Sequence, residues 1–272
     1  MENGVSLPSP WRRNAQRKKV VGQLTGKVAL VTGGSRGLGA VIAEGLADEG
    51  ADVAISYVSS ADKARAIVEK LQRKGVRSIA IRADQADLSS AAPLVDRVVK
   101  ALGRLDILVN NAAIAVQGQA VDDPDLDVPA LDHQWQLNVL GAISVTRAAS
   151  RALADNGRII FIGSLVGTHV PMAGAADYAG TKAAINGYAR GISRDLGPRK
   201  ITVNVVQPGV MPTDMMVEVL GEQGPPDSFL DMHPIRRIAT LEEVTSLVVF
   251  LAGPSAGYMT GSVIDVAGGL GT

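Results

Sequence analysis

The chain has 272 residues with 27 basic and 27 acidic side chains, so it lacks the positive excess typical of nucleic-acid or anionic-membrane binding. It contains no cysteine, which excludes disulfides and thiolate metal sites and fits a reducing, cytoplasmic compartment. Hydrophobic residues make up 46% of the chain and aromatic residues only 3%. A core of Ala, Val, Ile and Leu suits helices packed closely on a parallel sheet, and we expect a soluble protein without membrane spans.

The charge is unevenly distributed along the chain. The first 24 residues carry five basic side chains and one acidic side chain, with two prolines. They lack the apolar run of ~7–15 residues that a secretory signal needs. We therefore predict that residues 1–24 form a basic, mobile extension. Residues 25–272 have a length that suits a single α/β domain.

Short apolar runs alternate with helical patterns of apolar residues along the rest of the chain. The runs predict strands at 27–31, 53–57, 77–82, 106–109, 157–163, 201–206 and 262–266. The helical patterns lie at 40–48, 61–73, 89–102 and 131–154, in a segment ending near 196, and at 241–251. Such alternation indicates a parallel sheet with helices on both faces.

A glycine-rich turn joins the first predicted strand to the first helix. Its sequence is Thr32-Gly33-Gly34-Ser35-Arg36-Gly37-Leu38-Gly39, with the spacing TGxxxGxG. Glycines let the backbone approach the phosphates of a dinucleotide, and the helix N-terminus offers free N–H groups and a positive dipole. Glycine-rich turns also occur for steric reasons alone, but this position between strand and helix favours dinucleotide binding.

The end of the second predicted strand indicates which dinucleotide binds. An acidic side chain there would bind the adenosine ribose of NAD and repel a 2′-phosphate. The chain has Tyr57 instead, followed by Val58, Ser59 and Ser60, and the first acid is at position 62. Arg36 in the glycine turn carries a guanidinium suited to phosphate, unless it merely faces solvent. We predict a preference for NADP(H), with NAD(H) possible.

Polar residues also follow the third and fourth predicted strands. Asp84 either accepts a hydrogen bond from the adenine amine or caps a turn, and the sequence leaves both open. Asn110 and Asn111 can lock the sheet backbone or face a ligand. The acidic segment 117–130 lacks the glycine and the closing glutamate of an EF-hand, so we expect a surface loop and no metal site.

The strongest candidates for catalysis are Tyr178 and Lys182. Four residues apart on a predicted helix, their phenol and ammonium emerge on one face. A phenol has a pKa of ~10, and a nearby cation favours the phenolate and suits the tyrosine to proton transfer. Ser164 ends the fifth strand, at the edge where α/β sheets bind ligands, without the G-x-S-x-G elbow of serine hydrolases. Asn138 lies within a predicted helix although asparagine is a poor helix former.

The chain resembles the short-chain dehydrogenase/reductase family over about residues 24–270, in the compact branch that includes the 3-oxoacyl-carrier-protein reductases. The resemblance rests on motifs in a shared order: Thr32–Gly39, Asn110–Ala112, Asn138, Ser164, Tyr178, Lys182 and Pro208-Gly209. It implies a Rossmann-type, doubly wound parallel sheet of about seven strands in three α/β/α layers. It also implies a homotetramer or homodimer. Ala113 departs from the glycine that usually follows Asn-Asn-Ala in the family.

The resemblance further implies roles for these side chains. Tyr178 would donate or accept the proton, Ser164 would hydrogen-bond the substrate carbonyl, and Asn138 would hold a water that relays protons. Lys182 would bind the nicotinamide ribose and lower the tyrosine pKa. The residues expected to bind the cofactor are Gly33, Ser35, Arg36, Gly37, Leu38, Gly39, Tyr57, Ser59, Ser60, Asp84, Gln85, Asn111, Ala112, Tyr178, Lys182, Pro208, Gly209, Val210 and Thr213.

We therefore expect an NADPH-dependent carbonyl reductase, or alcohol dehydrogenase in the reverse direction, whose small-molecule substrate is a ketone or of the 3-oxoacyl type. The Met- and Pro-rich residues 210–237 are predicted to form a substrate lid. Apolar residues there and at 166–172 favour a hydrophobic substrate. The alternatives are an NAD-dependent hydroxysteroid- or sugar-type dehydrogenase and a non-catalytic, cofactor-sensing protein on the same fold.

Overall fold

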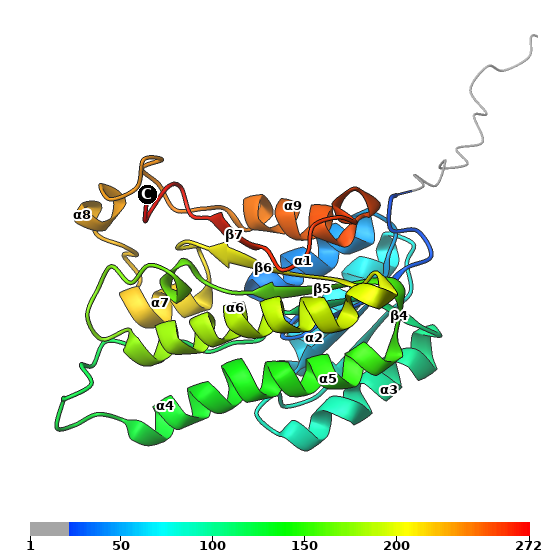
Figure 1. The fold of residues 1–272 in the computed structure, drawn as a ribbon, viewed down its shortest axis with the longest axis horizontal. Coiled ribbons are helices and arrows are strands. Elements are labelled where there is room, and N and C mark those ends of the chain that lie inside the picture. The colour runs from blue at the N-terminus through cyan, green and yellow to red at the C-terminus, as the bar shows by residue number, and fades with distance from the viewer. Residues whose placement is uncertain (1–21) are drawn as a thin grey trace, which may run out of the picture.

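A seven-stranded parallel sheet forms the centre of the computed structural model, which describes residues 22–272 (Figure 1). The order across the sheet is β3-β2-β1-β4-β5-β6-β7. The strands are β1 (Val28–Val31), β2 (Asp52–Tyr57), β3 (Ser78–Arg82), β4 (Leu105–Asn110), β5 (Leu153–Ile162), β6 (Thr202–Pro208) and β7 (Val263–Val266). Because the order changes direction between β1 and β4, the loops after these strands diverge and open a crevice at the carboxyl edge. The predicted doubly wound sheet is confirmed.

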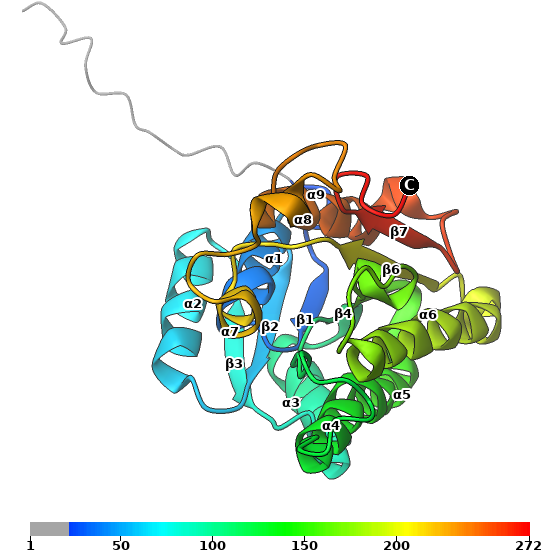
Figure 2. The same cartoon turned by 90° about the vertical axis from the view of Figure 1, so that its left-hand side faces the viewer.

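Helices cover both faces of the sheet and make three layers (Figure 2). One face is covered by α1 (Gly37–Asp48), α2 (Ala61–Arg73) and α9 (Leu241–Ala252). The other face is covered by α3 (Ala91–Leu102), α5 (Ala142–Ala152) and α6 (Ala176–Leu196). Beyond the carboxyl ends of the strands lie α4 (Val128–Trp135), α7 (Asp214–Leu220) and α8 (Asp227–Leu230).

The alternation of side chains along each strand supplies both layers of the core. On β1, Ala29 and Val31 pack into the layer of α1 and α9, whereas Val28 and Leu30 pack into the layer of α3 and α5. All four are buried, as expected for a parallel strand with helices on both sides. Close packing of small and branched side chains therefore fixes the strands on both faces. The loops at the carboxyl ends of the strands start from this rigid sheet.

The long helix predicted over 131–154 is wrong as a continuous α-helix. Between α4 and α5 the chain forms a π-helical turn, η2 (Gln136–Gly141), and it leaves the helix for β5 at Leu153. At Gly141 the backbone approaches the carbonyl oxygen of Gln85 so closely that a Cβ would lie 2.2 Å from it. Apolar periodicity does not distinguish a π turn from an α turn, because one extra residue shifts the pattern only locally.

Residues 22–24 pack onto the folded chain, so the extension predicted for residues 1–24 does not include them. Leu24 is buried, and its N–H donates to the carbonyl oxygen of Glu49 at 2.9 Å. The N–H of Gln23 donates to the carboxylate of the same glutamate at 3.0 Å. The remainder of the predicted extension, residues 1–21, lies outside the described residues. No helix within residues 22–272 is long and apolar enough to span a bilayer.

Candidate active site

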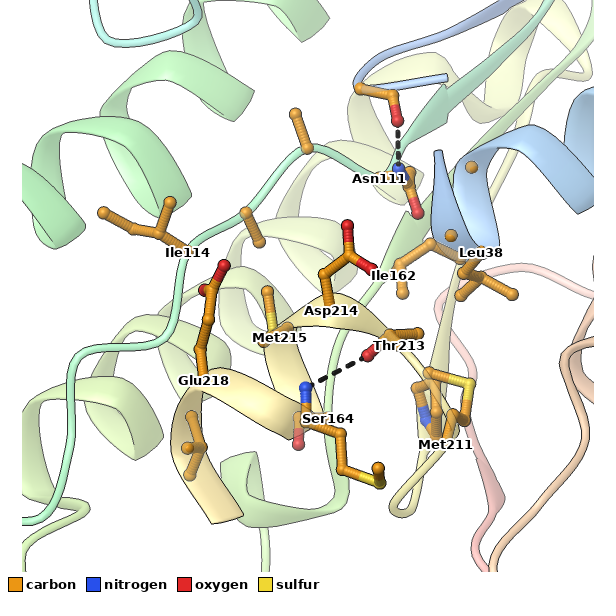
Figure 3. Close-up of a pocket in the computed structure, with 18 of the residues that line it drawn as sticks. Leu38, Asn111, Ile114, Ile162, Ser164, Met211, Thr213, Asp214, Met215 and Glu218 are labelled. Carbon is orange, nitrogen blue, oxygen red and sulfur yellow. Dashed lines mark hydrogen bonds between the residues drawn. The ribbon is translucent and has the colours of Figure 1, made fainter. Parts of the chain in front are cut away.

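One cavity of about 480 Å³ lies at the carboxyl edge of the sheet, between the glycine turn, the strand ends and the segment 210–237 that was predicted to form a lid (Figure 3). Every residue predicted to bind the cofactor lines this cavity except Asp84. Ser164, Tyr178 and Lys182 line it as well, whereas Asn138 does not. Segments that follow six of the strands, β1 to β6, thus converge on one space, as expected at the carboxyl edge of a doubly wound sheet.

The glycine turn has the geometry of a phosphate cradle. Gly33 and Gly37 have φ values of 65° and 53°, in the left-handed region that favours glycine. A Cβ on Gly39 would lie 2.5 Å from Nδ2 of Asn111, which donates to the carbonyl oxygens of Thr32 at 2.9 Å and Gly33 at 3.2 Å. Asn111 therefore locks the turn against β4. Because no side chain caps the start of α1, its first N–H groups remain free for a diphosphate.

The adenosine end of the cavity carries polar side chains and no acid from β2. Tyr57, Ser59 and Ser60 line it, and Gln85 donates from Nε2 to the carbonyl oxygens of Ala112 and Leu137 at 3.0 and 3.1 Å. Gln85 thereby ties the loop after β3 to the loop after β4.

Asp84 lies outside the cavity, on the exposed side of the loop after β3. Its Oδ1 accepts a hydrogen bond from the N–H of Ala86 at 2.9 Å, and its carbonyl oxygen accepts from Oγ of Ser90. Of the two roles that the sequence leaves open, the structure shows the turn cap. The local Asx-turn uses one oxygen of the carboxylate, and the contact with the adenine amine stays a prediction.

Tyr178 and Lys182 lie one turn apart on α6 and are 8% and 5% exposed. Nζ of Lys182 donates to the carbonyl oxygen of Ile162 at 3.1 Å and lies 5.6 Å from the centroid of the tyrosine ring. The phenol hydrogen-bonds with the side chain of Ser164, the second residue after the end of β5. Two hydroxyls and an ammonium therefore meet at one wall of the cavity.

Burial dominates the electrostatics of this group. It raises the pKa of Tyr178 to about 12, although the hydrogen bond with Ser164 acts in the opposite direction. It also lowers the pKa of Lys182 to about 8. The pKa of Tyr178 is therefore raised overall, because burial disfavours the phenolate, and the lowering effect expected from Lys182 stays a prediction.

Asn138 occupies the middle of the π-helical turn and is 4% exposed. Its Oδ1 accepts from the N–H of Ile114 at 2.9 Å, and its Nδ2 donates to the carbonyl oxygen of the same residue at 2.8 Å. A longer contact of 3.4 Å joins Nδ2 to Oγ1 of Thr181. The side chain thus pins the loop after β4 beside α6. Its expected role in holding a water stays a prediction.

The remaining part of the cavity is mostly apolar. Its lining includes Val166, Pro171, Met172, Met211, Met215 and Phe229. Two acids of α7, Asp214 and Glu218, also line the cavity (Figure 3), and Oδ2 of Asp214 accepts from Nη1 of Arg36 at 3.0 Å, at the adenosine end. Neither acid was among the predicted site residues, because an irregular lid was expected there. The available signal was Thr213, whose hydroxyl caps α7 by accepting from the N–H of Met216 at 3.3 Å.

The acidic segment 117–130 uses its carboxylates as turn and helix caps. Asp123 accepts from the N–H of Asp125 at 2.9 Å, and Asp127 caps α4 by accepting from the N–H of Ala130 at 3.1 Å. Across residues 22–272, no group of three or more His, Cys, Asp or Glu side chains is arranged to hold a metal ion.

Comparison with known proteins identifies relatives that match almost the whole chain. Residues 33–271 match the family described as enoyl-(acyl carrier protein) reductase. The chain is 38% identical over 252 residues, 92% of its length and 100% of the relative, to a cyclic-di-GMP-binding biofilm dispersal mediator protein of Escherichia coli K12. It is 37% identical over 250 residues, 90% of its length and 98% of the relative, to a 3-oxoacyl-[acyl-carrier-protein] reductase of Staphylococcus aureus Mu50.

A solved structure has the same architecture. The short-chain dehydrogenase from Burkholderia cenocepacia J2315, crystallised in complex with NADP, superposes with a TM-score of 0.85 at 44% identity. The match covers 92% of this chain and 100% of that one. The chain therefore belongs to the short-chain dehydrogenase/reductase family and is an NAD(P)-dependent oxidoreductase of that family.

Proposed function

We propose that the protein is an NADPH-dependent carbonyl reductase that acts on a hydrophobic ketone or 3-oxoacyl-type substrate. The observation that carries this proposal is the meeting of Ser164, Tyr178 and Lys182 at the wall of the cavity that begins at the glycine turn. The glycine turn, which would bind the phosphates, and the side chains that would transfer a proton thus line the same cavity. An apolar part of this cavity lies beside them.

When bound, the nicotinamide cofactor supplies the hydride. Tyr178 and Ser164 would hydrogen-bond the substrate oxygen as it gains negative charge. Because burial raises the pKa of Tyr178 to about 12, the phenol is protonated at neutral pH and can donate its proton to that oxygen. Lys182, which already holds the carbonyl oxygen of Ile162, would bind the nicotinamide ribose and stabilise the phenolate that remains.

Three observations support NADPH over NADH. The end of β2 contributes Tyr57 and two serines to the cavity and no carboxylate that would repel a 2′-phosphate. Arg36 lines the same region. The similar protein from Burkholderia cenocepacia was crystallised with NADP. An NAD-dependent dehydrogenase is the alternative, and a comparison of melting temperatures with NADPH and with NADH separates the two.

The substrate proposal is tested by NADPH consumption with a panel of ketones, β-keto esters and acyl thioesters. We expect turnover with apolar carbonyl compounds, because methionine, valine and phenylalanine side chains line the substrate side. The second candidate is a ligand-binding protein without turnover, since one relative is described as cyclic-di-GMP-binding. Binding of cyclic-di-GMP with no NADPH consumption across the panel would favour that candidate.

We further propose that the protein is a cytoplasmic homotetramer or homodimer. Large apolar side chains on the surface support an association of copies, among them Leu140, Phe250 and Tyr258. Light scattering coupled to gel filtration measures the mass directly, and a monomer of 28.2 kDa would contradict the proposal.

A further inference from the structure

Three charged side chains from separate segments meet at the adenosine end of the cavity, where Arg36 and Asp214 line the cavity and Lys63 lies just outside it. Arg36 belongs to the glycine turn, Lys63 to the first turn of α2, and Asp214 is the first residue of the lid helix α7. Nη1 of Arg36 lies 3.0 Å from Oδ2 of Asp214, and Nζ of Lys63 lies 4.0 Å from the same oxygen. Both cations therefore point at a single anionic oxygen that the lid supplies.

This oxygen lies where two cations converge, beside residues that line the adenosine end of the cavity. Arg36 and Asp214 line the cavity together with Tyr57, Ser59 and Ser60, the residues at the end of β2. A guanidinium and an ammonium that converge on one point bind phosphate as readily as carboxylate.

The ion pairs of Asp214 with Arg36 and Lys63 are weak enough for another anion to replace the carboxylate. The side chains of Arg36, Asp214 and Lys63 are 54%, 56% and 60% exposed. Exposed ion pairs of this kind contribute about 0–1 kcal/mol. A phosphate carries nearly two negative charges, so it can displace one carboxylate from the two cations.

We propose that Asp214 is an internal substitute for the 2′-phosphate of NADP(H). This inference rests on the proposed NADPH site. Without the cofactor, Asp214 holds the start of α7 against the glycine turn. The 2′-phosphate takes over Arg36 and Lys63, and α7 is released from the turn. NADH has no such group and leaves the contact in place.

The same exchange connects the cofactor site to the substrate side. Met215, Met216 and Glu218 follow Asp214 on α7 and line the substrate part of the cavity. Displacement of the first residue of this helix therefore frees residues that face the substrate. Asp214 becomes a determinant of cofactor selectivity, and Lys63 a second cation for the phosphate.

Asp214→Asn tests the competition, because it keeps the shape of the side chain and the Thr213 cap while removing the charge. The probes are adenosine 2′,5′-bisphosphate and adenosine 5′-monophosphate, measured by calorimetry on the full chain at low salt. We expect the variant to bind the bisphosphate about 3- to 10-fold more tightly than the wild type, a gain that salt reduces. Its affinity for the monophosphate should not change.

Two matched variants test whether the effect of Asp214→Asn comes from competition between Asp214 and the phosphate or from any change of charge near the cavity. Asp62→Asn removes an acid on the same turn of α2 as Lys63, but Asp62 pairs with Arg65 at 3.4 Å and does not line the cavity. Asp62→Asn should leave the ratio between the affinities for the bisphosphate and the monophosphate unchanged. Lys63→Met should weaken bisphosphate binding and spare the monophosphate.

Hydrogen exchange of residues 213–220 tests the release. In the wild type, the bisphosphate should raise exchange in this segment and the monophosphate should not. In Asp214→Asn, exchange should be raised without either ligand. The proposed release of α7 is overturned if exchange of residues 213–220 changes neither when the wild type binds the bisphosphate nor in Asp214→Asn without a ligand.

The binding outcomes distinguish this inference from the proposed function. If the wild type prefers the bisphosphate and Asp214→Asn binds it no more tightly, the competition is overturned while the NADPH site stands. If the wild type does not prefer the bisphosphate over the monophosphate, the NADPH site itself is overturned, and the inference with it.

Discussion

Nζ of Lys182 lies 5.6 Å from the centroid of the Tyr178 ring, and both side chains are almost fully buried on one face of α6. The lysine has one hydrogen bond, to the carbonyl oxygen of Ile162, and no carboxylate partner among the described residues. Burial therefore disfavours both the phenolate form of Tyr178 and the ammonium form of Lys182.

Tyr178→Phe should reduce turnover by about 10²–10⁴-fold, the range typical for loss of a general acid. NADPH affinity should change little, because the substitution removes one hydroxyl at the substrate side of the cavity. Steady-state kinetics and calorimetry measure the two quantities. Tyr188→Phe is the control on the same helix, since the ring of Tyr188 packs edge-on against Phe161 away from the cavity. A Tyr178→Phe enzyme with near wild-type turnover would contradict the proposed mechanism.

Lys182→Met should make the protein more stable near neutral pH while it reduces activity. Burial lowers the folded-state pKa of Lys182 from 10.5 to about 8, so the charged form costs up to about 3 kcal/mol of stability below pH 8. The lost hydrogen bond to Ile162 offsets about 1 kcal/mol of that gain.

The pH dependence of this effect has a defined sign. Between about pH 8 and 10.5 the unfolded chain binds more protons at Lys182 than the folded chain does, so wild-type stability rises with pH. The melting-temperature difference between Lys182→Met and the wild type should therefore shrink over this window. Tyr178 acts oppositely above pH 10, because its folded pKa is raised to about 12. The comparison is best made from pH 6 to 9.5, and a variant less stable than wild type throughout would refute the burial argument.

Asn138→Ala should destabilise the fold by about 1–3 kcal/mol, because the N–H and C=O of Ile114 both lose their side-chain partner. Ile114 lines the cavity, so we also expect turnover to fall more than NADPH affinity does. Urea unfolding and steady-state kinetics provide the measurements. Unchanged stability would show that water replaces the amide without cost.

Gly141→Ala should destabilise the protein by about 1–3 kcal/mol, the usual cost of overpacking. The new Cβ would lie 2.2 Å from the backbone oxygen of Gln85, which cannot move without shifting the loop after β3. Gly187→Ala on α6 is the matched control, because no atom lies within 4 Å of its added Cβ. That substitution should be neutral or stabilise by about 0.5–1 kcal/mol. Equal melting temperatures for the two variants would contradict the close packing at Gly141.

The local sequence was sufficient for much of the architecture. Apolar runs and helical periodicity predicted the strands and most helices, because burial on two faces demands continuous apolar strands. The spacing of Gly33, Gly37 and Gly39 predicted a turn that brings the backbone close to a dinucleotide, and in the structure Gly33 and Gly37 have the left-handed φ values that favour glycine. The interval between Tyr178 and Lys182 placed both on one face of a helix, since 3.6 residues complete an α-helical turn.

Tertiary structure decided how deeply the site residues are buried, how their pKa values shift and which groups they contact. The pKa of Tyr178 rises rather than falls because of burial, and burial depends on segments distant in the chain. Asp84 caps a turn, Asn138 pins Ile114 from a π-helical turn, and Asp214 reaches Arg36 across 178 positions. The sequence by itself determined the local conformations and the order of the motifs, because those depend on neighbouring residues. The contacts and charges of the site depend on long-range packing, which only the folded chain defines.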